Sequence, residues 1–214
     1  TFYHYFSVRN YKLSKPDFPL VAVIFPSRTE FANYCAKDKI NAAAGMVGYY
    51  LRTSNRVAMF DSPREVLTSS QAPNSKTARP TSNRPRTRYR YNRNVKSVEE
   101  ILHADSIEGN LRDTIVHEAT HQIAFNSGLH SRIGETPKWV IEGLATVFEA
   151  PGIRDSSTSR FSKTRLNRGR FVRFGNFAAD RRKKNSLSQF VSTDTAFRSN
   201  ILDAYSEAWA LSFW

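Results

Sequence analysis

The chain has 214 residues and 40% apolar content, so it can bury the core of one domain or of two lobes around a cleft. It contains no run of about 18 apolar residues, which excludes a membrane-spanning helix. Its single cysteine, Cys35, excludes an internal disulfide framework and argues against thiolate ligation of zinc, while the net charge of +13 is concentrated in two segments.

The two basic segments stand apart from the rest of the chain. Residues 62–96 contain nine Lys and Arg against Glu65 alone, and residues 154–184 contain eleven against Asp155 and Asp180. The remaining residues therefore carry a small negative charge, and the basic character belongs to particular regions of the protein.

The first basic segment has the composition of a loop. Residues 69–93 are rich in Ser, Pro, Thr and Asn and nearly free of aliphatic side chains, which predicts a mobile insertion over residues 62–98. The arginines favour either contact with a polyanion, such as nucleic acid, acidic polysaccharide or anionic lipid heads, or a solubilising role. The solubilising role is favoured because only Tyr89 and Tyr91 lie among the arginines, without the pattern of a stacking platform.

The N-terminal region predicts two strands and a helix. Residues 2–9 alternate aromatic and polar side chains, and residues 20–25 form a short apolar run that ends before Pro26, so both are predicted as strands. The capping box at residues 27–30 predicts a helix that begins there and ends near Asp38. We expect its buried side to carry Phe31, Tyr34 and Cys35.

A hairpin and two helices are predicted further along the chain. Two segments rich in β-forming residues, 47–52 and 56–60, flank a three-residue turn and predict the hairpin. A helix is predicted over residues 110–126, with Gly128 as its stop. A second helix is predicted over residues 139–149, capped by Thr136, with Pro137 in its first turn and an apolar side formed by Ile141, Leu144, Val147 and Phe148.

The first of these helices contains the motif that points to chemistry, His117-Glu118-Ala119-Thr120-His121. In a helix, the two histidines project from one face about one turn apart, close enough to hold a single metal ion. Glu118 lies just round the helix, where its carboxylate can reach a water molecule on the metal and act as a base. The spacing predicts a zinc site for hydrolysis, with two histidines on the surface of an amphipathic helix as the alternative.

The third ligand follows by elimination. A metzincin would place Gly and His where this chain has Ala124 and Ser127, which excludes that class. His130 follows the predicted helix stop and is interpreted as an ordinary loop histidine. Glu142 is the strongest candidate, ahead of His130, Glu135 and Glu149, because it is predicted to lie in a capped helix directly facing the first one, beside Gly143.

Two further residues of the second helix have predicted roles. Gly143 allows a close approach to the first helix, since it has no side chain beyond hydrogen. Glu149 lies two turns beyond Glu142 on the same face. It is either an acceptor for the second ring N–H of a ligand histidine or part of a solvated helix end.

The phrases HEATHQIAFNSGL, PKWVIEGLATVFEAPG and AYSEAWAL resemble the gluzincin metallopeptidases, the superfamily of thermolysin and the aminopeptidase N relatives. Within that group they are most similar to a little-characterised bacterial peptidase-like family, over roughly residues 45–214. The resemblance implies an α+β, zincin-like fold: a twisted mixed sheet with the HExxH helix in an N-terminal lobe, residues 1–135, and a mostly helical C-terminal lobe, residues 136–214. It also implies that an edge strand, supplied here by the predicted hairpin, pairs with extended substrate, and it favours a periplasmic or secreted location.

The resemblance also assigns a role to Tyr205. Aminopeptidase-like gluzincins place a tyrosine about sixty residues after the ligand glutamate, where it hydrogen-bonds the oxyanion. Tyr205 lies at a similar distance from Glu142, although it can equally form a packed aromatic pair with Trp209, four residues later.

The sequence therefore predicts a zinc peptidase acting on a peptide or protein. His117, His121 and Glu142 would hold Zn²⁺, Glu118 would serve as general base, and Tyr205 would stabilise the oxyanion. The alternative is a basic polyanion-binding module that retains a structural or vestigial zinc site.

Overall fold

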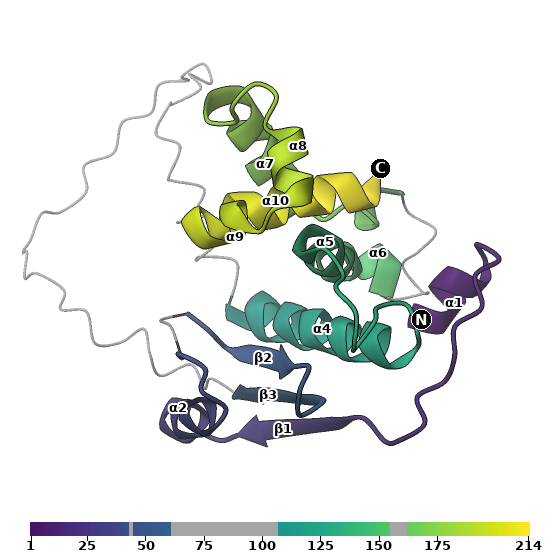
Figure 1. Ribbon diagram of the computed structural model, residues 1–214, viewed down its shortest axis with the longest axis vertical. Helices are drawn as coiled ribbons and strands as arrows, with labels where there is room; N and C mark the ends of the chain where they lie inside the picture. The colour runs from purple at the N-terminus through teal and green to yellow at the C-terminus, as the bar shows by residue number, and fades with distance from the viewer. Residues whose placement is uncertain (43–44, 61–106, 155–161) are drawn as a thin grey trace, which may run out of the picture.

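A computed structural model describes residues 1–42, 45–60, 107–154 and 162–214 of the chain. Within these ranges the protein is α+β: a small mixed sheet of three strands lies beside a mostly helical C-terminal region (Figure 1). The predicted fold class is confirmed at this level. The predicted basic insertion, residues 62–98, lies outside the described residues.

The elements follow one another in a simple order. The N-terminal region contains, in sequence, α1 (Phe2–Ser7), β1 (Val21–Phe25), α2 (Arg28–Lys37), β2 (Gly48–Leu51) and β3 (Arg56–Phe60). The helical region contains α4 (Ile107–Asn126), α5 (Lys138–Phe148), α6 (Pro151–Arg154), the 3₁₀ helix η2 (Ser162–Thr164), α7 (Arg168–Asp180), α8 (Leu187–Ser192), α9 (Thr195–Ser199) and α10 (Ile201–Phe213).

Among the strands that the structure describes, the sheet has the order β1-β3-β2, which makes β2 an edge strand of that sheet. β3 pairs parallel to β1, with Val23 opposite Ala58, and antiparallel to β2, with Tyr49 also opposite Ala58. The antiparallel pair is the predicted hairpin, so both its strands and the strand at β1 are confirmed. Asn55, in the turn, has the positive φ of 55° that asparagine tolerates better than most residues.

α2 begins where its capping box predicts. The Ser27 side chain accepts a hydrogen bond of 3.2 Å from the backbone N–H of Glu30, which satisfies one free donor of the first turn. Phe31 and Cys35 are fully buried on the side of α2 that packs on the sheet, and Tyr34 is partly buried there. One face of the sheet is thereby covered.

The N-terminal segment is a helix, α1, and the strand predicted over residues 2–9 is wrong. Its aromatic residues also recur at the helical spacing of four, and Phe2 and Phe6 both contact Phe148, at the end of α5, with ring centroids 4.9 and 6.3 Å apart. Tyr5 also contacts Phe148, with ring centroids 5.0 Å apart, whereas a strand would direct Tyr5 to the side opposite Phe2 and Phe6. Burial of all three rings against the helical region therefore selects the helix.

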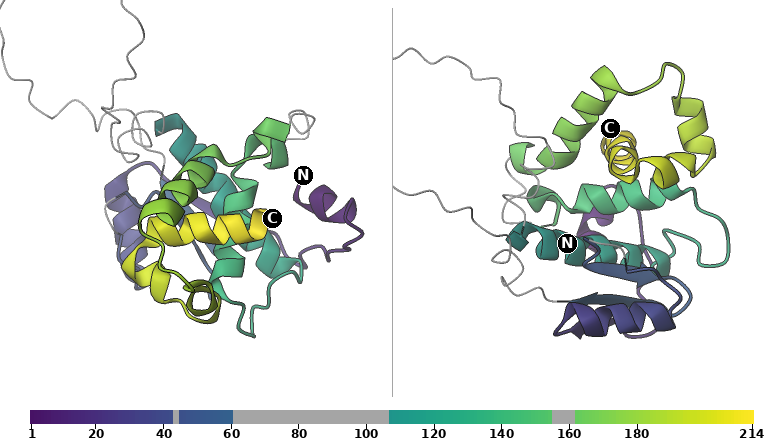
Figure 2. Two further views of the ribbon diagram at one scale, coloured as in Figure 1. Left: turned by 90° about the horizontal axis from the view of Figure 1, so that it is seen from above. Right: turned by 90° about the vertical axis from the view of Figure 1, so that its left-hand side faces the viewer.

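α4 lies between the sheet and the C-terminal helices, as the right-hand view of Figure 2 shows. It begins at Ile107, slightly before the predicted start, and Gly128 takes the left-handed φ of 79° just beyond its end. The Gln122 amide fixes the helix to the sheet, because it donates hydrogen bonds of 3.0 Å to the carbonyl oxygens of Val21 and Asn55.

α5 lies on the side of α4 away from the sheet and differs from its prediction in two details. Its N-cap is Pro137, and no side chain caps it, so the predicted Thr136 cap is wrong. Gly143 makes its close approach to α10 and not to α4: a Cβ there would lie 2.5 Å from the Ala208 carbonyl oxygen and would collide with the Ser212 hydroxyl.

α7 is held on α10 by buried ion pairs. Asp203, which is 1% exposed, accepts hydrogen bonds from Arg173 at 2.9 Å and from Arg181 at 3.0 and 3.2 Å. The buried Glu207 accepts one of 2.8 Å from Arg182. Arginines of the second basic segment thus pair with carboxylates inside the molecule.

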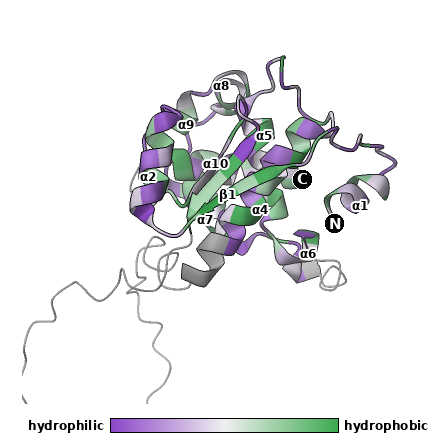
Figure 3. Cartoon of the chain, turned by 90° about the horizontal axis from the view of Figure 1, so that it is seen from below, coloured by the Kyte–Doolittle hydropathy of each residue, from purple (hydrophilic) through white to green (hydrophobic). Residues whose placement is uncertain are grey.

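Hydropathy follows this architecture. Seen from the sheet side, β1 is coloured as apolar, whereas α2 carries hydrophilic residues on its outer side (Figure 3). Among the described residues, no helix combines the length and the apolar character needed to cross a membrane.

Candidate metal centre

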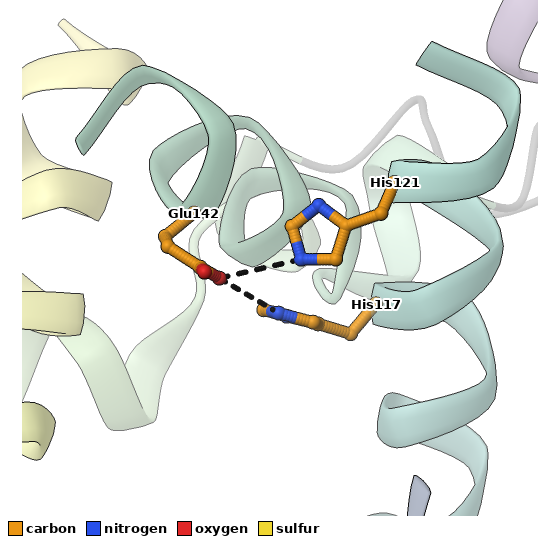
Figure 4. A group of neighbouring side chains, drawn as sticks. All are labelled: His117, His121 and Glu142. Carbon is orange, nitrogen blue, oxygen red and sulfur yellow. Dashed lines mark hydrogen bonds and ion pairs between the residues drawn. The ribbon is translucent and has the colours of Figure 1, made fainter. Parts of the chain in front are cut away.

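Three side chains from two helices converge between α4 and α5. His117 and His121 project from α4 toward Glu142 on α5, as Figure 4 shows. The Oε2 atom of Glu142 lies 3.2 Å from Nε2 of His117 and 3.3 Å from Nε2 of His121. One ligand atom from each residue can be chosen so that all three lie within 4.8 Å of one another.

The local sequence explains this convergence. The two histidines are four residues apart on a continuous helix, so their rings lie on the same face, with centroids 4.6 Å apart and planes nearly perpendicular. Glu142 belongs to a helix whose apolar side carries the buried Val147 and Phe148, and that packing holds α5 beside α4. The site is therefore built on two rigid elements of the core.

Glu149, at the end of α5, orients His117. Nδ1–H of His117 donates a hydrogen bond of 2.8 Å to Oε1 of Glu149, which leaves Nε2 as the ring nitrogen directed at Glu142. The predicted contact between Glu149 and a ligand histidine is present, and Glu149 is buried rather than solvated. Hydrogen-bond acceptors of this kind fix the tautomer of metal-binding histidines.

Arg170 and Asn167, in the region of α7, hold Glu149 in turn. Nε and Nη2 of Arg170 donate hydrogen bonds of 3.2 and 3.1 Å to the two oxygens of Glu149, and Nδ2 of Asn167 donates one of 2.8 Å. The Asn167 side chain also caps α7 by accepting from the backbone N–H of Arg170. Sequence reasoning missed both residues, since only the fold brings α7 to the end of α5.

The electrostatics of the site favour positive charge. Burial lowers the pKa of His117, but its hydrogen bonds to the carboxylates of Glu142 and Glu149 outweigh burial and raise that pKa to about 10. Burial raises the pKa of Glu149, whereas Arg170 and His117 lower it to about 2. Burial likewise opposes ionisation of Glu142, and the two histidines hold its pKa well below the ordinary value. Both carboxylates are therefore ionised at neutral pH.

Glu118 and Tyr205 lie beside this cluster. Glu118 is half-buried, and its carboxylate makes no hydrogen bond or ion pair with the part of the chain that the structure describes. Tyr205 lies on α10, and the centroid of its ring is 5.9 Å from the centroid of the His117 ring. Burial raises the pKa of Tyr205, and the carboxylates of Glu142 and Glu118 raise it further, so its hydroxyl is protonated at neutral pH.

The other candidates lie outside the cluster. Glu135 is exposed. His130 is not the ordinary loop histidine of the prediction, because it is buried against Phe125, and burial, together with His121, lowers its pKa to about 4. Trp209 has ring contacts with Phe171 and Phe213, while Tyr205 has them with His117 and Phe197, so the predicted pairing of Tyr205 with Trp209 is not among the contacts of the described rings.

The donor set suits zinc. Two imidazole nitrogens and one carboxylate oxygen, the first imidazole oriented by a second carboxylate, match the ligands that zinc takes in catalytic sites, where a fourth position is left for water. Calcium and magnesium prefer sites built from oxygen atoms alone. The chemistry of the residues thus fits zinc better than those hard cations.

Comparison with known proteins finds one family profile that matches the same region. Residues 112–214, which include both histidines, Glu118, Glu142, Glu149 and Tyr205, match the sequence profile of a family described as a protein of unknown function (DUF1570). No curated protein and no solved structure matches the chain.

Proposed function

We propose that this protein is a zinc-dependent peptidase of gluzincin type with a zincin-like fold. The observation that carries the proposal is the convergence of His117, His121 and Glu142, with a further carboxylate, Glu118, next to His117 and without a partner among the described residues. A structural zinc site is usually closed by four protein ligands, whereas this set offers three.

Each residue then has a defined task. His117, His121 and Glu142 would hold the zinc ion, which as a Lewis acid makes water a nucleophile near neutral pH. The Glu118 carboxylate accepts the proton that the attacking water loses and delivers it to the amine leaving group. The Tyr205 hydroxyl, kept protonated by its surroundings, donates a hydrogen bond to the oxygen of the peptide carbonyl as negative charge develops there.

The arrangement of the sheet supports a peptide substrate. β2 is an edge strand packed next to α4, and Tyr50 on β2 stacks on Phe125 of α4, with ring centroids 5.8 Å apart. An extended peptide can add to such an edge through backbone hydrogen bonds. Bound there, it would lie beside the helix that carries the two histidines.

The proposal is tested by replacing Glu118 with Gln. Because Glu118 is not a ligand, Glu118→Gln should retain zinc and the fold while kcat for peptide hydrolysis falls by about 10²- to 10⁴-fold, the usual contribution of general acid–base catalysis. Zinc is measured by elemental analysis on the samples used for kinetics with a broad peptide library.

His117→Ala provides the matched comparison, since it should lose both zinc and activity. Full zinc content in His117→Ala would refute the ligand assignment. Equal hydrolysis by the wild type and Glu118→Gln, or no hydrolysis by the wild type on the whole library, would refute the peptidase.

A further inference from the structure

We propose that Arg52 and Arg132 form a carboxylate-binding site for the peptide substrate, an inference that rests on the function proposed above. Arg52 follows the edge strand β2, and Arg132 lies in the loop between α4 and α5. The site would make the enzyme prefer peptides with an acidic side chain or a free C-terminal carboxylate.

The two arginines line an open cavity of about 480 Å³, together with Thr53 and Ile133. This volume lies within the range of about 300–1,000 Å³ that is usual for ligand sites. All four residues are exposed, and Ile133 is fully so, which leaves the cavity accessible from solvent.

Each guanidinium group contacts another part of the protein that holds it in position. Nη2 of Arg132 donates a hydrogen bond of 3.0 Å to the backbone carbonyl oxygen of Arg52. The Cζ atom of Arg52 lies 5.9 Å from the centre of the Phe125 ring, a cation–π contact. The hairpin turn and the loop after α4 thus bring the two arginines to one cavity.

Neither guanidinium group has a carboxylate partner within the described ranges, in contrast to the ion-paired arginines of α7 and its C-terminal end. The positive charges of both arginines act on the Tyr50 hydroxyl. Burial raises the pKa of Tyr50, and the charges of Arg132 and Arg52 act to lower it. Because the two arginines line the cavity, it carries positive charge. A planar guanidinium group can donate two parallel hydrogen bonds to a carboxylate.

The position of the cavity connects it with the proposed active site. Tyr50 stacks on Phe125, and Phe125 lies four residues after His121 on α4, a rise of about 6 Å along a helix. β2 runs beside α4 and ends at the cavity. A peptide extended along β2 would pass from the histidines to the two arginines, which favours a carboxylate of the peptide over a free anion as the ligand.

The test measures binding with the catalytic base removed. Zinc-loaded Glu118→Gln is titrated with three fluorescent peptides of equal length: one with an internal Glu and an amidated end, one with Gln there and a free C-terminus, and one with Gln and an amidated end. We expect at least one carboxylate peptide to bind at least about fivefold more tightly than the neutral one, and the difference to shrink with added salt. The peptide that gains affinity identifies the source of the carboxylate.

Variants in the same background complete the experiment. Arg52→Ala keeps the carbonyl that Arg132 contacts, so the fold should be retained while the preference falls to less than about twofold. Arg198→Ala, an exposed arginine on α9, should leave the preference unchanged. Equal affinity for all three peptides, or a preference that survives replacement of both Arg52 and Arg132, would overturn the inference. Loss of the preference in Arg52→Ala without any peptide hydrolysis by the wild type would support the arginine site and refute the peptidase.

Discussion

Glu149 fixes the orientation of the His117 ring, and Arg170 fixes Glu149 through both of its oxygens. Arg170 also lies over the ring of Tyr205, with its Cζ atom 5.3 Å from the ring centre. One side chain therefore contacts both the support of a proposed ligand and the proposed oxyanion donor. We infer that Arg170 positions both groups.

Loss of this support should weaken zinc binding. Glu149→Gln and Arg170→Gln remove one partner from the chain of hydrogen bonds, and changes behind a metal ligand usually cost about 10- to 100-fold in metal affinity. Competition against a chelator of known affinity measures the effect. Arg168→Gln is the control, because Arg168 lies exposed on the same helix. Unchanged affinity in Glu149→Gln and Arg170→Gln would show that the hydrogen bonds do not support the site.

His130 should make the fold sensitive to acid. Its pKa is about 4 in the folded protein, below the ordinary 6.5, so between these values the unfolded state binds more protons. The free energy of unfolding should consequently decrease as the pH falls through this window. Denaturant unfolding at several pH values should show a smaller decrease for His130→Leu than for the wild type, whereas His4→Gln, at an exposed position, should behave as the wild type. An identical pH dependence of His130→Leu and wild type would contradict this role.

Single residues also show how far sequence reasoning reaches. Helical spacing predicts that His117 and His121 share one face of a helix, and that Glu149 shares a face with Glu142. Both predictions concern residues of the same helix, so they need no knowledge of tertiary packing. Arg170 and Asn167 could not be assigned, since their contact with Glu149 depends on where the chain returns after α6. Signals for such partners lie in tertiary packing, which one sequence does not reveal.

Between elements, α5 and α10 approach each other closely at Gly143. Gly143 faces Ala208 and Ser212 without room for a methyl group, whereas Gly175, on α7, has nothing within 4 Å of the place where a Cβ would stand. The two glycines thus have opposite roles. The first is required by packing, and the second only adds freedom to the unfolded chain.

Alanine substitutions should separate these roles. Gly143→Ala forces α5 and α10 apart and should lower the free energy of unfolding by about 1–3 kcal/mol, the usual cost of overpacking. Gly175→Ala should raise it by about 0.4–1 kcal/mol through helix propensity and a less flexible unfolded state. Urea denaturation of both variants provides the comparison. Gly143→Ala as stable as Gly175→Ala would mean that the helices can shift apart without cost.

The elements differ in how well they could be predicted. α2 has a capping box and a buried face that agree, and both were found from sequence. α1 was predicted as a strand because its aromatic residues fit a period of two as well as a period of four, and only contact with Phe148 selects the helix. Short segments with ambiguous periods are decided by what they pack against.

Across the whole molecule, much of the positive charge in the second basic segment is neutralised by carboxylates of the same chain. Arg154, Arg170, Arg173, Arg181 and Arg182 lie in the second basic segment, and each pairs with a carboxylate of the same chain. The pair of Arg154 with Asp113 connects α6 to α4, and the other four connect α7 and its C-terminal end to α10 and the end of α5. This use of the arginines weakens the case for a polyanion-binding module in the described part of the chain.

The proposed zinc ligands come from both sides of the predicted lobe boundary at residue 135, because α4 carries the histidines and α5 carries Glu142. Zinc should therefore stabilise the molecule as a whole. At a free concentration of about 100 times its Kd, a ligand that binds only the folded state adds about 2.7 kcal/mol, which for a chain of this size raises Tm by about 5–10 °C.

Thermal unfolding with zinc and with a chelator measures this gain. The shift in Tm should be largely lost in Glu142→Gln, because the remaining histidines lie on one helix and cannot connect α4 to α5. Glu135→Gln, at an exposed position shortly before α5, should retain the shift in Tm. Magnesium should produce no comparable shift, since it prefers oxygen ligands in octahedral geometry. An equal zinc-dependent shift in Glu142→Gln would mean that zinc stabilises the protein from another site, and the connection between the two helices would have to be rejected.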